Sequence, residues 1–332
     1  MHTIRHTTPL AAMISLLIVT PGIGSAAEAQ EQASIRLKWH HQTQFAGVYV
    51  ARQKGFYRQA GLQVKIHGIQ EAGELKVSPI QRVVAGEEDF GITSQSQFLV
   101  ERSKGAPVVA IAAIYQRSPV GFFTMKRSGI SRPQQFVGKT VTFAPTHEIH
   151  LKAMLRNLGT DFGTLKVVPY SYDLTPWYSG KVDVWAGYIM NQPVDARLAG
   201  HEVNIILPDD YGVHMYDDIL FTTEQTIAER PKLVERFLTA TLRGWRYTIE
   251  NPEEATEITL AMYPHLKREK QLAMLLASIP LIHTGEHQIG WMVREIWEET
   301  QTLFLDYKIL SQPVDLQRAI TVQFLQRIYA ER

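Results

Sequence analysis

The sequence predicts an α/β protein in which mostly parallel sheets are flanked by helices. Three observations carry this prediction: the composition, the chain length, and the alternation of strand-like and helix-like segments. Of the 332 residues, 45% are hydrophobic and 20% are charged, which supplies a large core and excludes an intrinsically disordered chain. Because single cores stop growing beyond about 250–300 residues, we expect two lobes.

Local patterns predict each element in chain order. The first strand is predicted at Ser34–Trp39, and apolar residues at helical spacing predict a helix over Gln44–Gly55. Leu62–Ile66 alternates apolar and polar residues, which is typical of a half-buried strand. Ile80–Ala85 and Glu148–Leu158 have the pattern of helices. Further short apolar runs predict strands at Phe90–Thr93, Val108–Tyr115, Phe122–Met125, Thr140–Ala144, Lys166–Tyr170, Val182–Trp185 and Val203–Leu207.

Strands that alternate with helices are typical of parallel sheets joined by right-handed crossovers. Beyond Tyr216 we expect the chain to turn helical. Pro231 stands at a predicted helix start, and Asn251-Pro252-Glu253-Glu254 combines a capping residue, a first-turn proline and first-turn acids. These C-terminal helices should pack on elements that the earlier residues have already formed.

The charge balance and the lack of cysteine exclude several functions. With 34 Lys and Arg against 33 Asp and Glu, the formal charge is +1, which provides no basic face for a nucleic-acid partner. The absence of cysteine excludes disulfides, thiolate metal sites, a cysteine nucleophile and a lipid-modified cysteine.

The N-terminus has the pattern of a secretory signal peptide. Arg5 precedes an uncharged apolar run, Leu10–Val19, and Ala27 and Ala29 have the small-x-small spacing of a cleavage site. A proline and two glycines end the run before the length of about 20 residues that a membrane anchor needs. We therefore expect residues 1–29 to be removed on export to the periplasm, without lipid attachment.

Two histidine motifs raise the question of a metal site. His147-Glu148-Ile149-His150 resembles a zinc-protease helix that is one residue too short, and its spacing supplies no third ligand. His283-Thr284-Gly285-Glu286-His287 contains a helix-breaking glycine. The chain has no Gly-x-Ser-x-Gly elbow. We expect no metal site, no catalytic residue and no cofactor.

Four segments contain no charged residue, and most begin at or just past the end of a predicted strand. They are Trp39–Ala51, Phe90–Leu99, Val184–Val194 and Tyr211–Tyr216. Open α/β sheets bind ligands at the carboxyl ends of their strands. The segments are rich in aromatic rings and neutral amides, which suits a flat, weakly charged heterocycle held by stacking and hydrogen bonds. Core aromatics beside surface glutamines are the alternative interpretation.

Several short motifs follow one another between Ile35 and Glu254. They are Leu37-Lys38-Trp39, Gln44 through Ala51, Lys54 through Tyr57, Gly61 through Val64, Gly86 through Gly91, Gly138 through Val141, Gly180 through Val184, Gly187-Tyr188, Asn191-Gln192-Pro193, and Tyr211-Gly212-Val213 through Asp217. In this order they resemble the thiamine-pyrimidine-synthase-like branch of the type II periplasmic binding proteins.

The resemblance implies two α/β lobes that are joined by two crossing strands and close on a ligand by hinge motion. Residues 34–120 and 215–332 would form lobe 1, and residues 121–214 would form lobe 2. The resemblance also implies delivery of the ligand to an ABC permease and ATPase complex. We expect a monomer that meets the membrane only through the permease.

In relatives that bind a thiamine pyrimidine precursor, the ring lies between a tryptophan matching Trp39 and a tyrosine matching Tyr188. A glutamate of these relatives pairs with the aminopyrimidine edge, and Gln192 stands at its position here. We expect a hydroxymethylpyrimidine or formylaminopyrimidine as the first choice of ligand, and a flavin or pterin as the alternative. The expected ligand-binding residues are Trp39, Gln44, Phe45, Gln95, Thr146, His147, Trp185, Tyr188, Asn191, Gln192, Tyr211 and Tyr216.

Two other classes of function are alternatives. The superfamily includes a eukaryotic pyrimidine synthase that consumes its own histidine and a bound pyridoxal phosphate, and that carries a cysteine-rich iron motif. Its lysine and histidine would fall near Thr93 and Gln97, so this chain matches neither them nor the cysteines, and we expect no enzyme. Related lobes also serve as input domains of membrane signalling proteins, which leaves a periplasmic sensory module as the second alternative.

Overall fold

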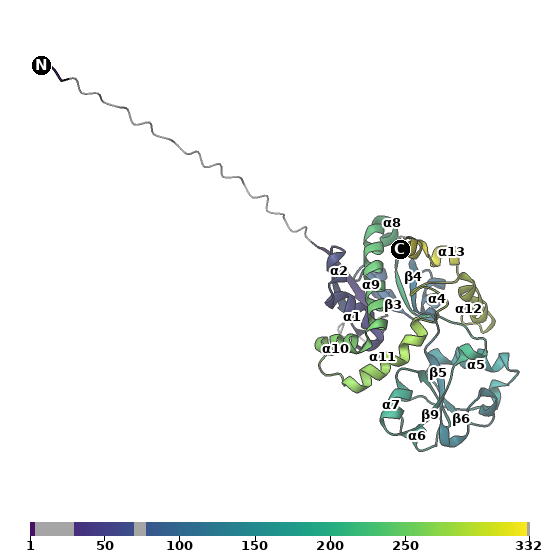
Figure 1. The fold of residues 1–332 in the computed structure, drawn as a ribbon. Coiled ribbons are helices and arrows are strands. Elements are labelled where there is room, and N and C mark those ends of the chain that lie inside the picture. The colour runs from purple at the N-terminus through teal and green to yellow at the C-terminus, as the bar shows by residue number, and fades with distance from the viewer. Residues whose placement is uncertain (4–29, 70–77, 331–332) are drawn as a thin grey trace.

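The structure is a computed structural model that describes residues 1–3, 30–69 and 78–330. Two five-stranded sheets, each flanked by helices, form two lobes (Figure 1). The predicted two-lobed α/β fold is therefore confirmed. The predicted signal peptide, apart from residues 1–3, lies outside the described residues.

The first sheet has the strand order β2-β1-β3-β10-β4. Strand β1 pairs in parallel with β2 and β3, and β10 pairs antiparallel with β3 and β4. All strands except β10 therefore run in one direction, as predicted for a mostly parallel sheet. The strands are β1 Glu31–Arg36, β2 Leu62–His67, β3 Phe90–Thr93, β4 Val108–Tyr115 and β10 Asp217–Thr223.

The second sheet has the order β7-β6-β8-β5-β9 and the same design. Strand β6 pairs in parallel with β7 and β8, whereas β5 pairs antiparallel with β8 and β9. Here β5 is the reversed strand. The strands are β5 Val120–Met125, β6 Thr140–Thr142, β7 Lys166–Val168, β8 Val184–Tyr188 and β9 Val203–Ile206.

The chain passes between the two sheets twice. Residues 116–119 lead from β4 to β5, and residues 207–216 lead from β9 back to β10. The reversed strand of each sheet is the strand that the chain enters directly after a crossing. The lobe limits expected from the sequence, 34–120 with 215–332 and 121–214, remain a prediction.

Helices cover both sheets (Figure 1). The α-helices are α1 Ala46–Gln53, α2 Phe56–Gln59, α3 Pro79–Val84, α4 Gln95–Ser103, α5 Glu148–Asn157, α6 Thr175–Tyr178, α7 Gln192–Leu198, α8 Glu224–Glu229, α9 Pro231–Glu250, α10 Pro252–Met262, α11 Arg268–Ile282, α12 Arg294–Asp306, α13 Leu316–Ala319 and α14 Gln323–Ala330. The 3₁₀ turns are η1 Thr43–Phe45, η3 Lys126–Ser128, η4 Pro133–Phe136, η5 Pro145–His147, η6 Phe162–Thr164 and η7 Pro208–Tyr211.

Strand β10 corrects the expectation that the chain turns helical beyond Tyr216. That expectation is wrong for Asp217–Thr223. Ile219-Leu220-Phe221 is buried because β10 lies inside the sheet, between β3 and β4. A short continuous apolar run does not distinguish a buried strand from a buried helix, and both partner strands lie far earlier in the chain.

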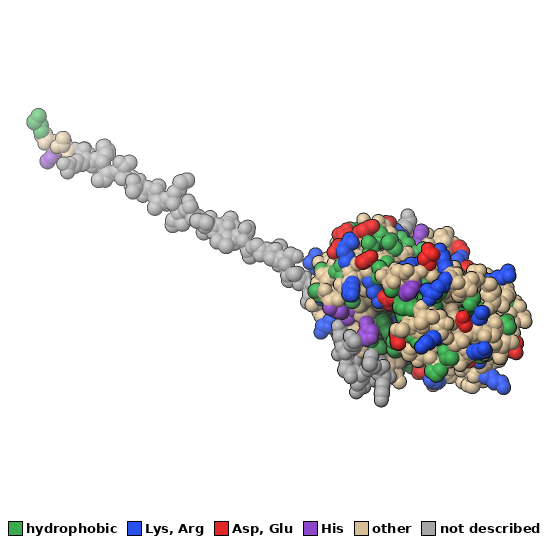
Figure 2. Space-filling model, turned by 90° about the horizontal axis from the view of Figure 1, so that it is seen from below, with side chains coloured by type: hydrophobic (Ala, Val, Ile, Leu, Met, Phe, Trp, Pro, Cys, Tyr) green, Lys and Arg blue, Asp and Glu red, His purple; other side chains and the backbone are tan. Residues whose placement is uncertain are grey.

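The surface carries both signs of charge. On the face that Figure 2 shows, Lys and Arg side chains lie among Asp and Glu side chains. This mixture agrees with the formal charge of +1. Within the described part of the chain, no helix combines the length and the apolar character needed to span a membrane.

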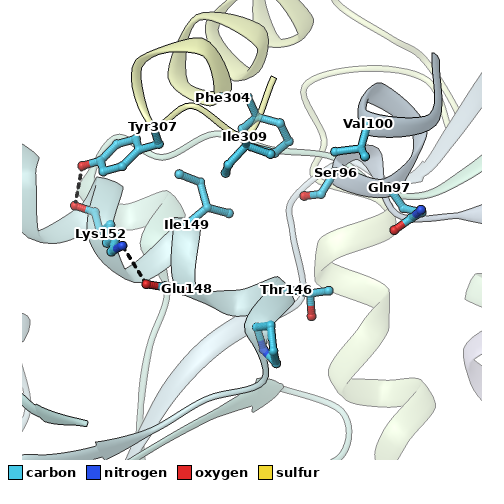
Figure 3. Close-up of a pocket in the computed structure, with 11 residues that line it drawn as sticks. Ser96, Gln97, Val100, Thr146, Glu148, Ile149, Lys152, Phe304, Tyr307 and Ile309 are labelled. Atoms are coloured by element: carbon cyan, nitrogen blue, oxygen red, sulfur yellow. Dashed lines mark hydrogen bonds and ion pairs between the residues drawn. The ribbon is translucent and has the colours of Figure 1, made fainter. Parts of the chain in front are cut away.

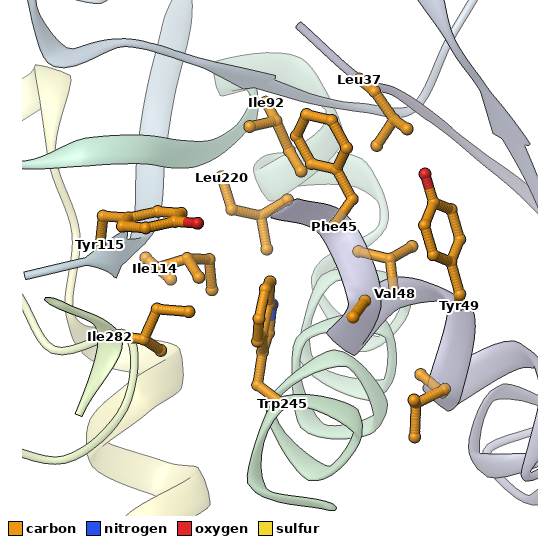
Figure 4. Close-up of a cluster of buried hydrophobic side chains, with 14 of the residues drawn as sticks. Leu37, Phe45, Val48, Tyr49, Ile92, Ile114, Tyr115, Leu220, Trp245 and Ile282 are labelled. Atoms are coloured by element: carbon orange, nitrogen blue, oxygen red, sulfur yellow. The ribbon is translucent and has the colours of Figure 1, made fainter. Parts of the chain in front are cut away.

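Helices α1 and α9 approach each other unusually closely in the first lobe. A Cβ atom on Gly244 of α9 would lie 2.1 Å from the carbonyl oxygen of Gly47 in α1, and one on Gly47 would lie 2.3 Å from the ring of Trp245. Trp245 packs into the buried cluster that also holds Phe45 and Leu220 (Figure 4). The two glycines therefore allow α1, and the turn η1 before it, to lie against the core.

Replacing Gly244 with alanine tests this contact. Overpacking of this kind costs about 1–3 kcal/mol, although alanine favours a helix more than glycine does. We expect Gly244→Ala to lower the free energy of unfolding in a urea titration. Thr239→Ala, on the exposed side of the same helix, is the control and should change it little. Equal stability of Gly244→Ala and wild type would contradict the close contact.

Candidate ligand-binding site

Three strand ends from the two sheets meet at the junction of the lobes. Lys38 follows the end of β1, Asp217 and Asp218 begin β10, and Tyr188 ends β8 of the second sheet. Their side chains form one hydrogen-bonded group, which we call the interlobe cluster. It lies where strand ends of open α/β sheets bind ligands.

The Lys38 ammonium is the centre of the interlobe cluster. It pairs with the carboxylate of Asp217, lies 2.7 Å from Oδ1 of Asp218, and donates to the Tyr188 hydroxyl at 3.1 Å. The Tyr188 hydroxyl in turn donates to Oδ2 of Asp217 at 2.6 Å. The side chains of Lys38, Asp217 and Asp218 are only 12%, 4% and 1% exposed, so each charge depends on its partners.

A strained backbone position lets two consecutive carboxylates reach one ammonium. Successive side chains of a strand point to opposite faces, but Asp218 has a φ of 44°, in the left-handed region. Such a conformation costs a non-glycine residue about 1–3 kcal/mol. The Asp218 N–H donates to Oδ1 of Asp217 at 2.7 Å, and Nε2 of Gln44 donates to both carboxylate oxygens of Asp218 at 3.0 and 3.2 Å. These bonds hold the turned backbone in place.

Burial and charge oppose each other in the interlobe cluster. Burial disfavours the charge on Lys38, but the carboxylates of Asp217 and Asp218 outweigh it and raise the pKa of Lys38 well above its usual value. Burial raises the pKa of Asp218 to about 6. Burial and the neighbouring Asp217 also raise the pKa of Tyr188. With both carboxylates ionised, the cluster has one more negative than positive charge and therefore attracts hydrogen-bond donors.

Two neutral histidines of the second lobe adjoin the interlobe cluster. The ring of His147 lies 5.9 Å from the ring of Tyr188, centroid to centroid, and Nε2 of His150 lies 3.3 Å from the Ser118 hydroxyl. Burial lowers the pKa of His147 to about 4 and that of His150 to about 3. Nδ1 of each ring is buried without a hydrogen-bond partner among the described residues. The backbone N–H of His147 donates to Ala144 O at 2.8 Å.

The structure brings Gln44, His147 and Tyr188 of the predicted residues together around the interlobe cluster. Trp39 directly follows Lys38, and 36% of its surface is exposed. Its ring lies edge-on to His40, with centroids 4.9 Å apart. Part of the Trp39 side chain is therefore accessible.

Three of the predicted aromatic residues are embedded in the protein. Phe45 and Trp185 are buried in the hydrophobic core. The Tyr216 ring lies 6.2 Å from the ring of Trp297, and its hydroxyl accepts a hydrogen bond from the Val293 N–H at 2.8 Å. The expectation that Phe45, Trp185 and Tyr216 contact a ligand remains a prediction.

The remaining predicted residues hold backbone groups or line the surface. Oε1 of Gln95 accepts from the Tyr216 N–H at 2.9 Å, and Oε1 of Gln192 accepts from the Tyr188 N–H at 3.1 Å. The Tyr211 carbonyl accepts from Asn157 at 3.0 Å. Asn191 is the residue before α7, and Thr146 lies on the exposed turn η5.

Sequence reasoning missed Lys38, Asp217 and Asp218 as site residues. It treated the charge-free segments as evidence for an uncharged site, whereas the ends of two of these segments lead into buried charges. Lys38 directly precedes the segment Trp39–Ala51, and Asp217 directly follows Tyr211–Tyr216. The charged residues at the borders of these segments could therefore have indicated the site residues Lys38 and Asp217.

The structure also addresses the histidine motifs. Among residues 1–3, 30–69 and 78–330, no three side chains of His, Cys, Asp or Glu are placed to hold a metal ion together.

Removing the Lys38 ammonium should lower the free energy of unfolding, because the buried carboxylates of Asp217 and Asp218 lose their partner. Lys38→Met breaks a buried pair, which typically costs about 3–5 kcal/mol. Because burial favours the protonated form of Asp218, the loss should be larger at pH 8 than at pH 5. Urea titrations at both pH values measure it. Lys54→Met, at a partly exposed pair with Glu254, is the control and should change little. An equally small loss for Lys38→Met at both pH values would contradict the cluster.

The buried His150 predicts a pH dependence of stability. The unfolded chain binds a proton at this residue below about pH 6.5, whereas the folded protein does so only near pH 3. Stability therefore falls as the pH drops below 6.5, and this group accounts for about 2 kcal/mol at pH 5. His150→Gln should reduce the difference between the free energies of unfolding at pH 7 and pH 5, with His283→Gln as an exposed control. The same difference in His150→Gln and wild type would refute this assignment.

The chain is similar to proteins that are named as binding proteins and as synthases. It is 29% identical to the riboflavin-binding protein RibY of Chloroflexus aurantiacus, over 96% of this chain and 92% of that protein. It is 27% identical to the formylaminopyrimidine-binding protein of Halalkalibacterium halodurans, over 97% and 99%. It is 26% identical to a 4-amino-5-hydroxymethyl-2-methylpyrimidine phosphate synthase of Legionella pneumophila, over 89% and 93%.

A solved structure supports the fold, and a family model identifies the family. The periplasmic aliphatic sulphonate binding protein SsuA of Escherichia coli superimposes with a TM-score of 0.67 at 16% identity, over 88% of this chain and 92% of that chain. At this identity the likeness shows the fold. Residues 42–255, more than half of the chain, match the family described as "NMT1/THI5 like". The chain therefore belongs to the NMT1/THI5-like family.

Proposed function

We propose that this protein is the substrate-binding component of an ABC importer and binds a flat nitrogen heterocycle between its lobes. The interlobe cluster is the observation that carries the proposal. It gathers buried hydrogen-bonding groups from both sheets at their strand ends, beside the partly accessible side chain of Trp39. Relatives named for binding riboflavin and formylaminopyrimidine support it.

A thiamine pyrimidine precursor is the first candidate ligand. An aminopyrimidine offers N–H donors on one edge, and the interlobe cluster has an excess of carboxylate acceptors. Trp39 supplies an aromatic face for stacking next to this edge. The relative named formylaminopyrimidine-binding protein, which matches nearly the whole chain, supports this ligand class.

A flavin is the second candidate, favoured by Gln192. This side chain has no charge to offer an aminopyrimidine, and its Oε1 already accepts from the Tyr188 N–H. A Cβ on Gly187 would lie 2.1 Å from the same oxygen, so the amide is packed tightly against the strand. A ligand that does not need a carboxylate here fits better, and the relative named for riboflavin supports a flavin.

We propose a binding protein rather than a synthase, although some relatives carry synthase names. The positions expected to match the synthase lysine and histidine are Thr93, buried at the end of β3, and Gln97, whose Nε2 donates to Glu101. Neither side chain supplies an amine for a Schiff base. Purified protein mixed with pyridoxal phosphate should show no imine absorption band, and such a band would favour the enzyme.

The periplasm is the proposed location, and the permease and ATPase are the proposed partners. The predicted signal peptide supports export, and the likeness to periplasmic binding proteins supports the compartment. We propose that the protein acts as a monomer. A periplasmic sensory role remains the alternative, and a neighbouring permease gene would favour transport.

Binding measurements test the proposed function. Isothermal titration with 4-amino-5-hydroxymethyl-2-methylpyrimidine, formylaminopyrimidine and riboflavin should reveal at least one ligand. Trp39→Ala should weaken its binding by about 1–3 kcal/mol if the ring stacks on Trp39. Tyr172→Ala is the control, because Tyr172 is 78% exposed at a different site. Binding of none of the three compounds would contradict the proposal, and unchanged binding by Trp39→Ala would remove this residue from the site.

A further inference from the structure

A groove of about 320 Å³ is lined by side chains from elements of both lobes (Figure 3). Its walls come from α4 of the first lobe, from η5 and α5 of the second lobe, and from the C-terminal end of α12. A volume of this order lies at the lower end of the range for small-molecule sites.

One residue of the groove directly precedes a residue of the proposed ring site in the chain. Thr146 lines the groove, and the next residue, His147, has its ring beside that of Tyr188. From the other lobe, Ser96 and Gln97 line the groove at the start of α4. Consecutive residues of η5 therefore reach the groove and the proposed ring site.

The groove has an apolar middle and hydroxyl groups at one end. Ile149 faces Phe304 and Ile309 across its middle, and the Ser96 and Thr146 side chains both lie on one side of it (Figure 3). A chain of carbon atoms that carries hydroxyl groups fits this lining, because its carbons pack on apolar side chains while its hydroxyls find polar partners.

The charges of the groove compensate each other. Glu148 and Lys152 both line it, and their side chains pair at 2.6 Å. The Lys152 ammonium also lies 4.9 Å from the centre of the Phe162 ring. The groove therefore offers no unpaired cation to an anionic group, and a phosphate here would lie near the Glu148 carboxylate without a full counter-charge.

We propose that this groove is a second subsite of the ligand-binding cleft and receives an uncharged, hydroxylated chain carried by the heterocycle. The proposal rests on the proposed function and narrows its ligand class. It favours a ring with a neutral polyol chain, such as riboflavin, over a single substituted pyrimidine. It also disfavours the phosphorylated form of the same ligand.

Three flavin probes and a pyrimidine separate the contributions of ring and chain. Riboflavin carries the chain, lumichrome lacks it, and flavin mononucleotide adds a phosphate to its end; 4-amino-5-hydroxymethyl-2-methylpyrimidine is the single-ring probe. Titrations should show riboflavin binding at least tenfold more tightly than each of the other three. Ser96→Phe and Val100→Phe fill the groove and should weaken riboflavin binding at least tenfold while leaving lumichrome binding unchanged. Thr175→Phe, at an exposed position of α6, is the matched control.

The outcomes test the groove proposal separately from the proposed function. If riboflavin and lumichrome bind equally, if the groove variants affect both alike or neither, or if only the pyrimidine binds, the groove proposal is overturned and the binding function stands. If none of the four probes binds to wild-type protein, both proposals fail. Thermal melting of each variant confirms that a lost affinity does not reflect unfolding.

Discussion

Three buried charges, on Lys38, Asp217 and Asp218, meet where the first sheet faces the second, and their pairing constrains both sheets. An ammonium or carboxylate left unpaired at this depth would cost several kcal/mol. The end of β1 and the start of β10 must therefore stay together, which the strand between them, β3, secures by pairing with both. The strained backbone of Asp218 persists because Gln44 and Asp217 hold it. Gln44 itself belongs to η1, whose position depends on the close packing of α1 against α9.

The two lobes contribute unequally to the interlobe cluster. The ion pairs of Lys38 with both aspartates lie within the first lobe, so they would survive a separation of the lobes. Tyr188 and His147 come from the second lobe and reach the cluster only when the lobes meet. The first lobe thus contains all three paired charges of the cluster, and the second lobe adds neutral aromatic groups to them. A ligand that meets a preassembled half-site loses less free energy to ordering than one that must organise both halves.

Local sequence patterns predicted the elements whose apolar spacing is characteristic of a strand or a helix. Phe90–Thr93 and Val108–Tyr115 have the predicted limits, and the helix predicted at Glu148–Leu158 differs by one residue. Strand β10 was not predicted, because it pairs with β3 and β4, which lie far earlier in the chain. The residues of the candidate site were harder to predict than the secondary-structure elements. Aromatic residues are common both in binding surfaces and in hydrophobic cores, so composition alone does not distinguish a site residue from a core residue. Phe45 and Trp185 are buried in the core. Pairing of Lys38 with Asp217 joins residues far apart in the chain, which no local pattern encodes.

The paired strands β5 and β9 have a consequence for how the protein can change. Phe122, just after the first crossing, lies opposite Ile206, just before the second. The second lobe is thus one continuous stretch of chain whose two ends are neighbours in space. Domains with adjacent ends are the ones that tolerate insertion and transfer. A gene rearrangement that exchanged this stretch between relatives would bring different side chains of the second lobe against an unaltered ion cluster.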